Sequence, residues 1–239
     1  MTTSIVGATG LVGGNFLTLS RTADLPGIST AVAITRRPIK KPDEEELAKG
    51  GKNIKVSNIV TADISGSIPK TTKILFSGLG TTRAAAGGFE NQYKVDHDLN
   101  LEIAKAAKKA GASTYVLVSA AGASVDSHFA YNRMKGDLDR DVAAIGFDRT
   151  IILRPALILG DRAEPHGALE SSAQGVIGFL KKVPLVSSGV KSVSVDAQDI
   201  AKAALKAIQK GGSGVEIYGN AEIIKLAEEY NAQIEAKGK

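Results

Sequence analysis

Three side chains in the middle of the chain have the chemistry and spacing of a proton-transfer site. Tyr131 and Lys135 stand four residues apart in YNRMK, so on a helix both point to one face. Ser119 ends a β-rich segment twelve residues earlier, and open α/β sheets place their ligands at strand carboxyl ends. A lysine cation favours a neighbouring phenolate, so we expect Lys135 to lower the pKa of Tyr131. Tyr131 would then give a proton to a carbonyl oxygen that Ser119 holds, and Lys135 would also bind a ribose.

A second group of residues, in SIVGATGLVGG near the start of the chain, has the composition of a phosphate-binding turn. Gly7, Gly10 and Gly13 follow G-x-x-G-x-x-G spacing between a predicted strand and a predicted helix. Such residues let the chain turn tightly and let a pyrophosphate reach backbone N–H groups at the helix N-terminus. The alternative interpretation is a tight strand-to-helix turn without a ligand.

The residues after the second predicted strand distinguish between two nucleotides. NAD sites usually carry an acidic residue about 20 positions after the glycines, where it holds the ribose 2′-OH. Here TRRPIKK offers Arg36 and Arg37, with no acid before Asp43. Because guanidinium groups bind phosphate in a bidentate fork, this pair suits the 2′-phosphate of NADP(H). A solvated basic turn is the alternative.

Two further segments follow predicted strands and belong to the same candidate site. Asp63 in TADIS is placed to meet an adenine, and Gly78 and Gly80 in SGLGTT would let the backbone approach the ribose and phosphates. Each segment is equally compatible with an ordinary turn.

The elements that must position these residues alternate along the chain. Nearly continuous apolar strands separated by amphipathic helices indicate a parallel sheet covered on both faces. We therefore predict an α/β fold, a Rossmann-type doubly wound parallel sheet with a small C-terminal substrate-side extension. It would form one domain over residues 1–239, with 160–195 as substrate-side loops and short helices. The expected strands are 3–8, 29–36, 53–60, 72–80, 113–121, 149–159 and 214–219, and the expected helices are 11–23, 91–111, 129–146, 196–211 and 221–236.

Composition excludes several classes of site and partner. The 239 residues include no cysteine, which excludes disulfides and zinc–thiolate sites, and the three histidines are too scattered for us to expect a metal site. The net charge of +5 is spread among acidic residues, so we expect no nucleic-acid partner. No apolar run reaches the roughly 18 residues of a membrane span, and MTTS leaves no room for a signal peptide. From the sequence we expect a cytoplasmic location.

Several of these motifs together resemble a known superfamily. GATGLVGG, Ser119 with YNRMK, and ILRPALILGDR are similar to the short-chain dehydrogenase/reductases, in their atypical branch. LGTTRAAAGGFENQYKVDHD and FDRTIILRPALILGDR most resemble the Tat-interacting-protein-like oxidoreductases and their fungal mitochondrial relatives, over residues 3–165. The resemblance implies a Rossmann fold, NADP(H), and Ser119, Tyr131 and Lys135 as catalytic residues. The cofactor-lining residues that it implies are Thr9, Leu11, Val12, Arg36, Arg37, Leu79, Gly80 and the segment beginning at Pro155.

One position departs from the family pattern. Many members carry an asparagine on the helix after the fourth strand, and Asp96 stands at the matching position here, so a proton relay built on that asparagine is in question. The resemblance also implies peripheral contact with the mitochondrial outer membrane, as described for the fungal relatives.

These observations favour an NADPH-dependent oxidoreductase of the carbonyl reductase type, acting on an aldehyde or ketone or the corresponding alcohol, as a monomer or homodimer. The alternative is an NADPH-binding regulatory or redox-sensing protein with little turnover, because the sequence holds no recognisable substrate signature. A sugar-nucleotide epimerase or dehydratase would usually retain NAD, which Arg36 and Arg37 disfavour.

Overall fold

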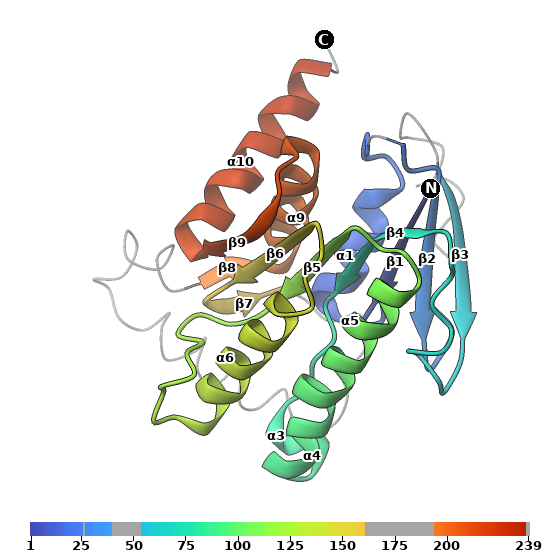
Figure 1. The fold of residues 1–239 in the computed structure, drawn as a ribbon. Helices are drawn as coiled ribbons and strands as arrows, with labels where there is room; N and C mark the ends of the chain where they lie inside the picture. Colours follow the sequence, from blue (N-terminus) through green and yellow to red (C-terminus); the bar gives the residue numbers. More distant parts are fainter. Residues whose placement is uncertain (26, 40–53, 161–193, 238–239) are drawn as a thin grey trace.

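A seven-stranded parallel sheet with strand order β3-β2-β1-β4-β5-β6-β9 forms the centre of the computed structural model (Figure 1). The structure describes residues 1–25, 27–39, 54–160 and 194–237. The strands are β1 (Thr2–Val6), β2 (Thr30–Thr35), β3 (Lys55–Val60), β4 (Thr72–Ser77), β5 (Thr114–Val118), β6 (Arg149–Arg154) and β9 (Gly214–Gly219). This order confirms the predicted α/β fold with a Rossmann-type doubly wound sheet.

Helices cover both faces of the sheet because its strands are apolar on both sides. Successive strand residues point to opposite faces, so Ile5 packs into one buried cluster and Val6 into the other. Figure 1 shows α5 and α6 together in front of the sheet, with α1 and α9 behind it. The cluster of Ile5 takes in α1 (Leu11–Ser20), α9 (Ala197–Lys210) and α10 (Asn220–Lys237), and the cluster of Val6 takes in α5 (Asn100–Lys109) and α6 (Ala130–Ala143).

The predicted strand 149–159 is wrong in its second half. It divides at Pro155, which has no N–H to donate to a neighbouring strand, and residues beyond it form β7 (Leu157–Leu159). β7 pairs with β8 (Ser194–Asp196) in a separate two-stranded sheet, so Ser194 and Val195 lie in a strand instead of the predicted loop. The rest of that loop prediction, 161–193, lies outside the described residues.

The predicted helix 91–111 is also more complex than its periodicity indicates. It consists of α4 (Phe89–Tyr93), a π-helical segment η1 (Lys94–Leu99) and α5. A short helix, α3 (Arg83–Ala86), precedes them and ends at Gly87, whose φ of 74° few other residues adopt. π-Helical segments inside α-helices often occur at functional sites, which directs attention to η1.

The strand order reverses at β1, the kind of point at which open α/β sheets form a crevice for ligands. β1 pairs with β2 on one side and with β4 on the other, so the connections that follow β1 and β4 leave in opposite directions. Ligands of open α/β sheets bind at this point, at the carboxyl ends of the strands.

Candidate functional site

The close packing of the first strand-to-helix turn depends on two of its glycines. Gly7 has a φ of 77°, and a Cβ on it would collide with the backbone of Gly78 at the end of β4. A Cβ on Gly13 would collide with the Gly7 carbonyl oxygen, so α1 packs directly on the turn. Gly10 differs, because a Cβ there would meet only the Gly7 oxygen, at 3.2 Å. Gly10 is thus less confined than the other two glycines, which serve packing.

The N-terminus of α1 is available to a ligand. Within the described residues Gly10 is its N-cap, no side chain caps its first N–H groups, and its first turn carries no acid. Thr9 and Gly10 are exposed, Val12 is buried in the core, and the Leu11 side chain lies against Gly160 after β7. The structure thus brings the predicted residues of this turn together around unpaired donors, which suit an anion.

Arg36 and Arg37 lie beside this turn. Parallel pairing places Val6 opposite Ile34, so the segments that follow the two strands leave the sheet side by side. Both arginine residues are exposed, and the Thr35 hydroxyl donates a hydrogen bond to the Arg37 carbonyl oxygen at 2.6 Å.

The segment Gly78–Gly80 lies on the other side of the turn. The Gly78 N–H donates to the Val6 carbonyl oxygen at 3.1 Å, which fixes this segment beside β1. The Asn100 side-chain amide donates to the Leu79 carbonyl oxygen at 3.2 Å. The predicted residues Gly78, Leu79 and Gly80 therefore lie beside the glycine turn, at the carboxyl ends of the central strands.

Asp63 lies farther out, after β3. Its carboxylate accepts the Gly66 N–H at 2.8 Å and the Ser65 hydroxyl at 3.2 Å, so it shapes its own loop. β2 lies between β3 and β1 in the sheet, so Asp63 also follows a strand carboxyl end but is two strands away from the glycine turn.

Ser119 and the loop that follows it are tied to two neighbouring elements. The Ser119 N–H donates to the Leu153 carbonyl oxygen of β6 at 2.7 Å, and the Ala121 N–H donates to the Pro155 carbonyl oxygen at 2.8 Å. The Asn132 side chain of α6 donates to the Gly122 carbonyl oxygen at 2.9 Å. These bonds connect β5, β6 and α6, so they set Ser119 relative to the helix that carries Tyr131.

Tyr131 and Lys135 lie one turn apart on α6 as predicted, in different surroundings. The Tyr131 residue is 42% exposed, whereas Lys135 is only 3% exposed and its Nζ donates to the Val118 carbonyl oxygen at 3.5 Å. Burial lowers the pKa of Lys135, and the carboxylates of Asp96 and Asp139 oppose that effect.

The expected lowering of the Tyr131 pKa is wrong for the chain in this structure. Although 42% of the residue is exposed, partial burial of the phenol raises the pKa of Tyr131, and the negative charge of Asp96 raises it further. The sequence showed the cation four residues away, but it did not show the desolvation or the carboxylate. Tyr131 therefore keeps its proton at neutral pH, which suits a proton donor.

Asp96 is placed at the centre of the site by η1. Its buried carboxylate accepts the Thr81 N–H at 2.6 Å and lies beside Gly80. Burial raises the pKa of Asp96, while Lys135 and the Thr81 N–H lower it. Asp96 thus connects the segment after β4 with the helix that carries Tyr131.

Sequence reasoning missed two residues that support the site. Asn100 is fully buried, and its amide oxygen accepts the Ser77 hydroxyl at 2.5 Å. Asp139 is buried on α6 and accepts a hydrogen bond from Arg154 Nε at 2.9 Å. A signal for both was present, because each polar residue stands four positions after a site residue, Asp96 or Lys135, on the same helix face.

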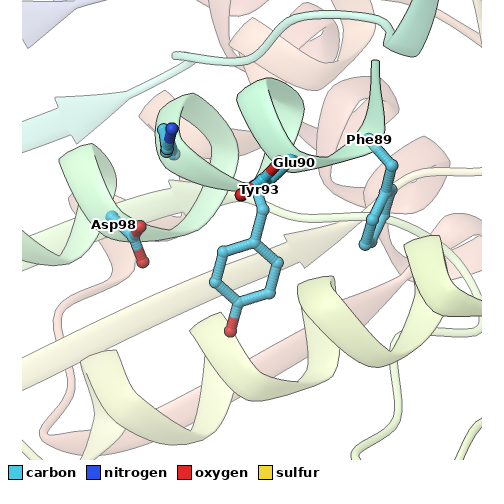
Figure 2. Close-up of a pocket in the computed structure, with 5 residues that line it drawn as sticks. Phe89, Glu90, Tyr93 and Asp98 are labelled. Carbon is cyan, nitrogen blue, oxygen red and sulfur yellow. The ribbon is translucent and has the colours of Figure 1, made fainter.

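Two open cavities lie near the helices of the site. One, of about 380 Å³, is lined by Phe89, Glu90, Tyr93, Lys94 and Asp98, and Figure 2 shows Tyr93 pointing from α4 toward α6. Its lining, within the described chain, includes none of the predicted site residues. The second, of about 400 Å³, lies between α6, β6 and β9, and Asp139, Arg154, Val215 and Ile217 contribute to its lining.

The described parts of the chain hold neither a helix long and apolar enough to cross a bilayer nor a cluster of three metal-ligating side chains.

Solved structures with the same architecture have very different sequences. A structure described as MoeE5 in complex with UDP-glucose and NAD matches with a TM-score of 0.63 at 14% identity, over 97% of this chain and 82% of that one. A short-chain type dehydrogenase/reductase from Mycobacterium ulcerans matches with a TM-score of 0.58 at 15% identity, over 93% and 90%. At these identities the likeness shows the shared fold.

Curated relatives match at much higher identity and nearly full length, although no protein-family model matches the chain. Protein fmp52-1, mitochondrial, from Aspergillus terreus is 42% identical over 241 residues, covering 95% of this chain and 98% of the relative. Protein FMP52, mitochondrial, from Eremothecium gossypii is 40% identical over 241 residues, covering 98% and 100%. These relatives confirm the predicted resemblance to fungal mitochondrial proteins, and the chain belongs to the Fmp52 family.

Proposed function

We propose that this chain is an NADP(H)-dependent oxidoreductase of the short-chain dehydrogenase/reductase type, which reduces an aldehyde or ketone. One observation carries the proposal. Tyr131 and the buried Lys135 share one face of α6, and Lys135 Nζ donates to the carbonyl oxygen of Val118, the residue before Ser119, at 3.5 Å.

The residues at the crevice fit a phosphorylated dinucleotide. The open side of Gly10 and the uncapped start of α1 suit a pyrophosphate, and the exposed pair Arg36 and Arg37 suits a 2′-phosphate. Gly78 packs closely on Gly13, whereas Gly80 is less confined and would leave room beside the turn for a ribose, whose hydroxyls Lys135 would bind. When bound, the nicotinamide would supply the hydride. The neighbour described with NAD supports a dinucleotide here, while the arginine pair supports NADP(H) in particular.

The protein side chains would handle the proton of the reaction. Tyr131 would donate its hydroxyl proton to the carbonyl oxygen, and Ser119 would hold that oxygen by a hydrogen bond. Donation leaves a phenolate, which the cation of Lys135 would stabilise. Because burial holds the pKa of Lys135 below its ordinary value, that cation would be sensitive to the charge of Asp96 and Asp139 beside it.

The location that we propose is mitochondrial, by peripheral association, because the relatives are named as mitochondrial proteins. A second candidate function is an NADPH-binding regulatory protein with little turnover. The 42% exposure of Tyr131 favours this alternative, because an enzyme would need this side chain shielded from water during transfer.

Replacing Tyr131 by phenylalanine tests the proposal, because it removes only the hydroxyl. We expect Tyr131→Phe to bind NADPH nearly as the wild type does and to reduce a carbonyl at least about a hundredfold more slowly. Tyr93→Phe makes the same chemical change at the cavity of Figure 2 and should leave the rate unchanged. The assay is NADPH oxidation across a panel of aldehydes, ketones and quinones, with NADPH binding followed by calorimetry.

Two outcomes would count against this mechanism. Full activity of Tyr131→Phe on a substrate that the wild type reduces would remove Tyr131 as proton donor. NADPH binding by the wild type without reduction of any panel member would favour the regulatory alternative.

A further inference from the structure

Two buried oxygen atoms beside the proposed site have no hydrogen-bond partner within the described residues. They are Ser119 Oγ, in a residue that is 5% exposed, and Asp139 Oδ1, in a residue that is 3% exposed. A buried hydroxyl or carboxylate oxygen without a partner is costly, so such atoms are rarely left alone. Both residues are bonded to adjacent residues of β6, because the Ser119 N–H donates to the Leu153 carbonyl oxygen at 2.7 Å and Arg154 Nε donates to Asp139 Oδ2 at 2.9 Å. A hydroxyl that can donate and a carboxylate oxygen that can accept thus stand unpaired beside the same two residues of β6. The Ser119 hydroxyl also lowers the pKa of the Asp139 carboxyl, as a neighbouring donor would.

Arg154 fixes the direction in which this carboxylate faces. Its Nε donates to Asp139 Oδ2 at 2.9 Å, which leaves Oδ1 for Ser119. Asp139 also stands one helical turn after Lys135, so Tyr131, Lys135 and Asp139 form one line along α6. The three side chains come from different elements, with Arg154 on β6, Asp139 on α6 and Ser119 at the end of β5.

We propose that Asp139 is a positioning residue that sets the direction of the Ser119 hydrogen bond toward the substrate. This inference rests on the proposed carbonyl reduction. A serine hydroxyl has a single proton to donate. If Asp139 is ionised, that proton goes to its carboxylate, and Ser119 can only accept a hydrogen bond, as from an alcohol. If Asp139 is protonated, it donates to Ser119 Oγ, and the serine proton is free for a carbonyl oxygen.

The charge of Asp139 depends on the groups that face it from each adjoining element. Burial raises its pKa, whereas the Ser119 hydroxyl at the end of β5, Arg154 on β6 and Lys135 on α6 lower it. Arg140 on α6 lines the same cavity between α6, β6 and β9, together with Asp139. That cavity is open to solvent, so protons can reach Asp139 without passing the substrate. Low pH should therefore favour carbonyl reduction, and high pH should favour alcohol oxidation.

Replacing Asp139 by asparagine fixes one of the two directions of the hydrogen bond between this residue and Ser119. In Asp139→Asn the amide oxygen can keep the bond from Arg154, which turns the amide NH₂ toward Ser119. The amide then donates at every pH, as the protonated acid does. We expect Asp139→Asn to retain carbonyl reduction, to lose the pH dependence that Asp139 causes, and to oxidise the corresponding alcohol about tenfold more slowly.

Two comparisons exclude a merely structural effect. Asp137→Asn makes the same change on the same helix, at a carboxylate paired with Arg140, and should alter neither pH profile. In a Ser119→Ala background, Asp139→Asn should have no further effect on either reaction, because Asp139 acts through Ser119. An independent, additive effect of Asp139→Asn in that background would overturn the proposal, as would a wild-type pH profile in Asp139→Asn.

A second measurement does not depend on turnover. The Asp139 carboxyl is titrated by ¹³C NMR in the full chain, with its signal assigned by its loss in Asp139→Asn. Removal of the serine donor in Ser119→Ala should raise the titration midpoint of Asp139, and an unchanged midpoint would overturn the contact on which the inference depends. If the wild type reduces no carbonyl, the proposed function fails by itself, and this titration still decides whether Asp139 holds Ser119.

Discussion

At the scale of single residues, Tyr131 has surroundings that oppose the phenolate it would have to form. Burial and the charge of Asp96 both raise its pKa, and Lys135 is the neighbouring cation on the same face of α6. A raised pKa means that the hydroxyl stays protonated at neutral pH and loses its proton only above the ordinary value near 10. Tyr131 is therefore ready to donate, and the stabilisation of its phenolate depends on groups brought near it during the reaction.

The effect of Asp96 on Tyr131 can be measured directly. The difference in ultraviolet titration between the wild type and Tyr131→Phe gives the midpoint of Tyr131 in the free protein, which we expect above about 10. Asp96→Asn removes a charge that disfavours the phenolate, so this midpoint should fall. Asp98→Asn removes a charge from the same helical segment without facing Tyr131, and should leave the midpoint in place. An unshifted midpoint in Asp96→Asn would mean that the carboxylate does not act on the phenol.

Arg36 and Arg37 should determine which nucleotide binds. Replacing both by alanine should weaken NADPH binding at least about tenfold and leave NADH binding nearly unchanged, because only NADPH carries the 2′-phosphate. Calorimetric titration with both nucleotides measures this. The double variant Lys108→Ala/Lys109→Ala loses the same charge at the end of α5 and should bind NADPH normally. Equal affinity of the wild type for NADH and NADPH would refute the interpretation of this arginine pair.

At the scale of elements, the turn between β1 and α1 predicts opposite results for two of its glycines. A Cβ on Gly10 meets a single atom, the Gly7 carbonyl oxygen, at a tight 3.2 Å, so Gly10→Val should fold with a small loss of stability and should lose NADPH binding. A Cβ on Gly13 collides with the turn itself, so Gly13→Val should lower the melting temperature strongly. Circular dichroism with NADPH titration tests both, and a folded Gly10→Val that binds NADPH normally would show that Gly10 does not face the nucleotide.

Most elements of the sheet could be predicted from sequence because their signals are local. Apolar strands such as 72–80 and amphipathic helices such as 129–146 show their period directly in the residues. The glycine spacing between the first strand and helix likewise indicated the turn, its packing and its position. The general rule for strand carboxyl ends predicted that Ser119 lies near the helix of Lys135, and Lys135 Nζ donates to the carbonyl oxygen of the neighbouring Val118.

The elements and residues that sequence reasoning missed depend on contacts between distant segments. A continuous apolar run across Pro155 does not show that its second half pairs with β8. Helical periodicity over 91–111 does not distinguish the π-helical turns of η1 from an α-helix. The pKa of Tyr131 required the position of Asp96, and the role of Asp139 required its bond to Arg154 on β6, which no local pattern contains.

At the scale of the whole molecule, charges that are buried or half-buried alternate in sign across the middle of α6. Arg154, Asp139, Lys135 and Asp96 connect β6 with the segment after β4, with positive and negative groups in turn. Buried charges are expensive to desolvate, so apolar residues of similar size would often stabilise a fold better. We infer that this row of charges serves the candidate site, because each member either lies at the site or acts electrostatically on a group that does.

The stability of the whole molecule should report nucleotide binding even if turnover is low. A ligand that binds only the folded state at 100 times its Kd adds about 2.7 kcal/mol, and a chain of this size gains roughly 2–4 °C per kcal/mol. We therefore expect NADPH at that concentration to raise the melting temperature by about 5–10 °C, followed by scanning calorimetry.

The variants separate binding from chemistry in the same experiment. Tyr131→Phe should show the full thermal shift, because the hydroxyl that it loses serves the substrate and not the nucleotide. Arg36→Ala/Arg37→Ala should lose most of the shift with NADPH and should behave like the wild type with NADH. Lys135→Ala should show a smaller shift, since this side chain is expected to hold the ribose. A wild type that NADPH fails to stabilise would contradict both the enzyme and the regulatory protein, because each requires the nucleotide to bind this crevice.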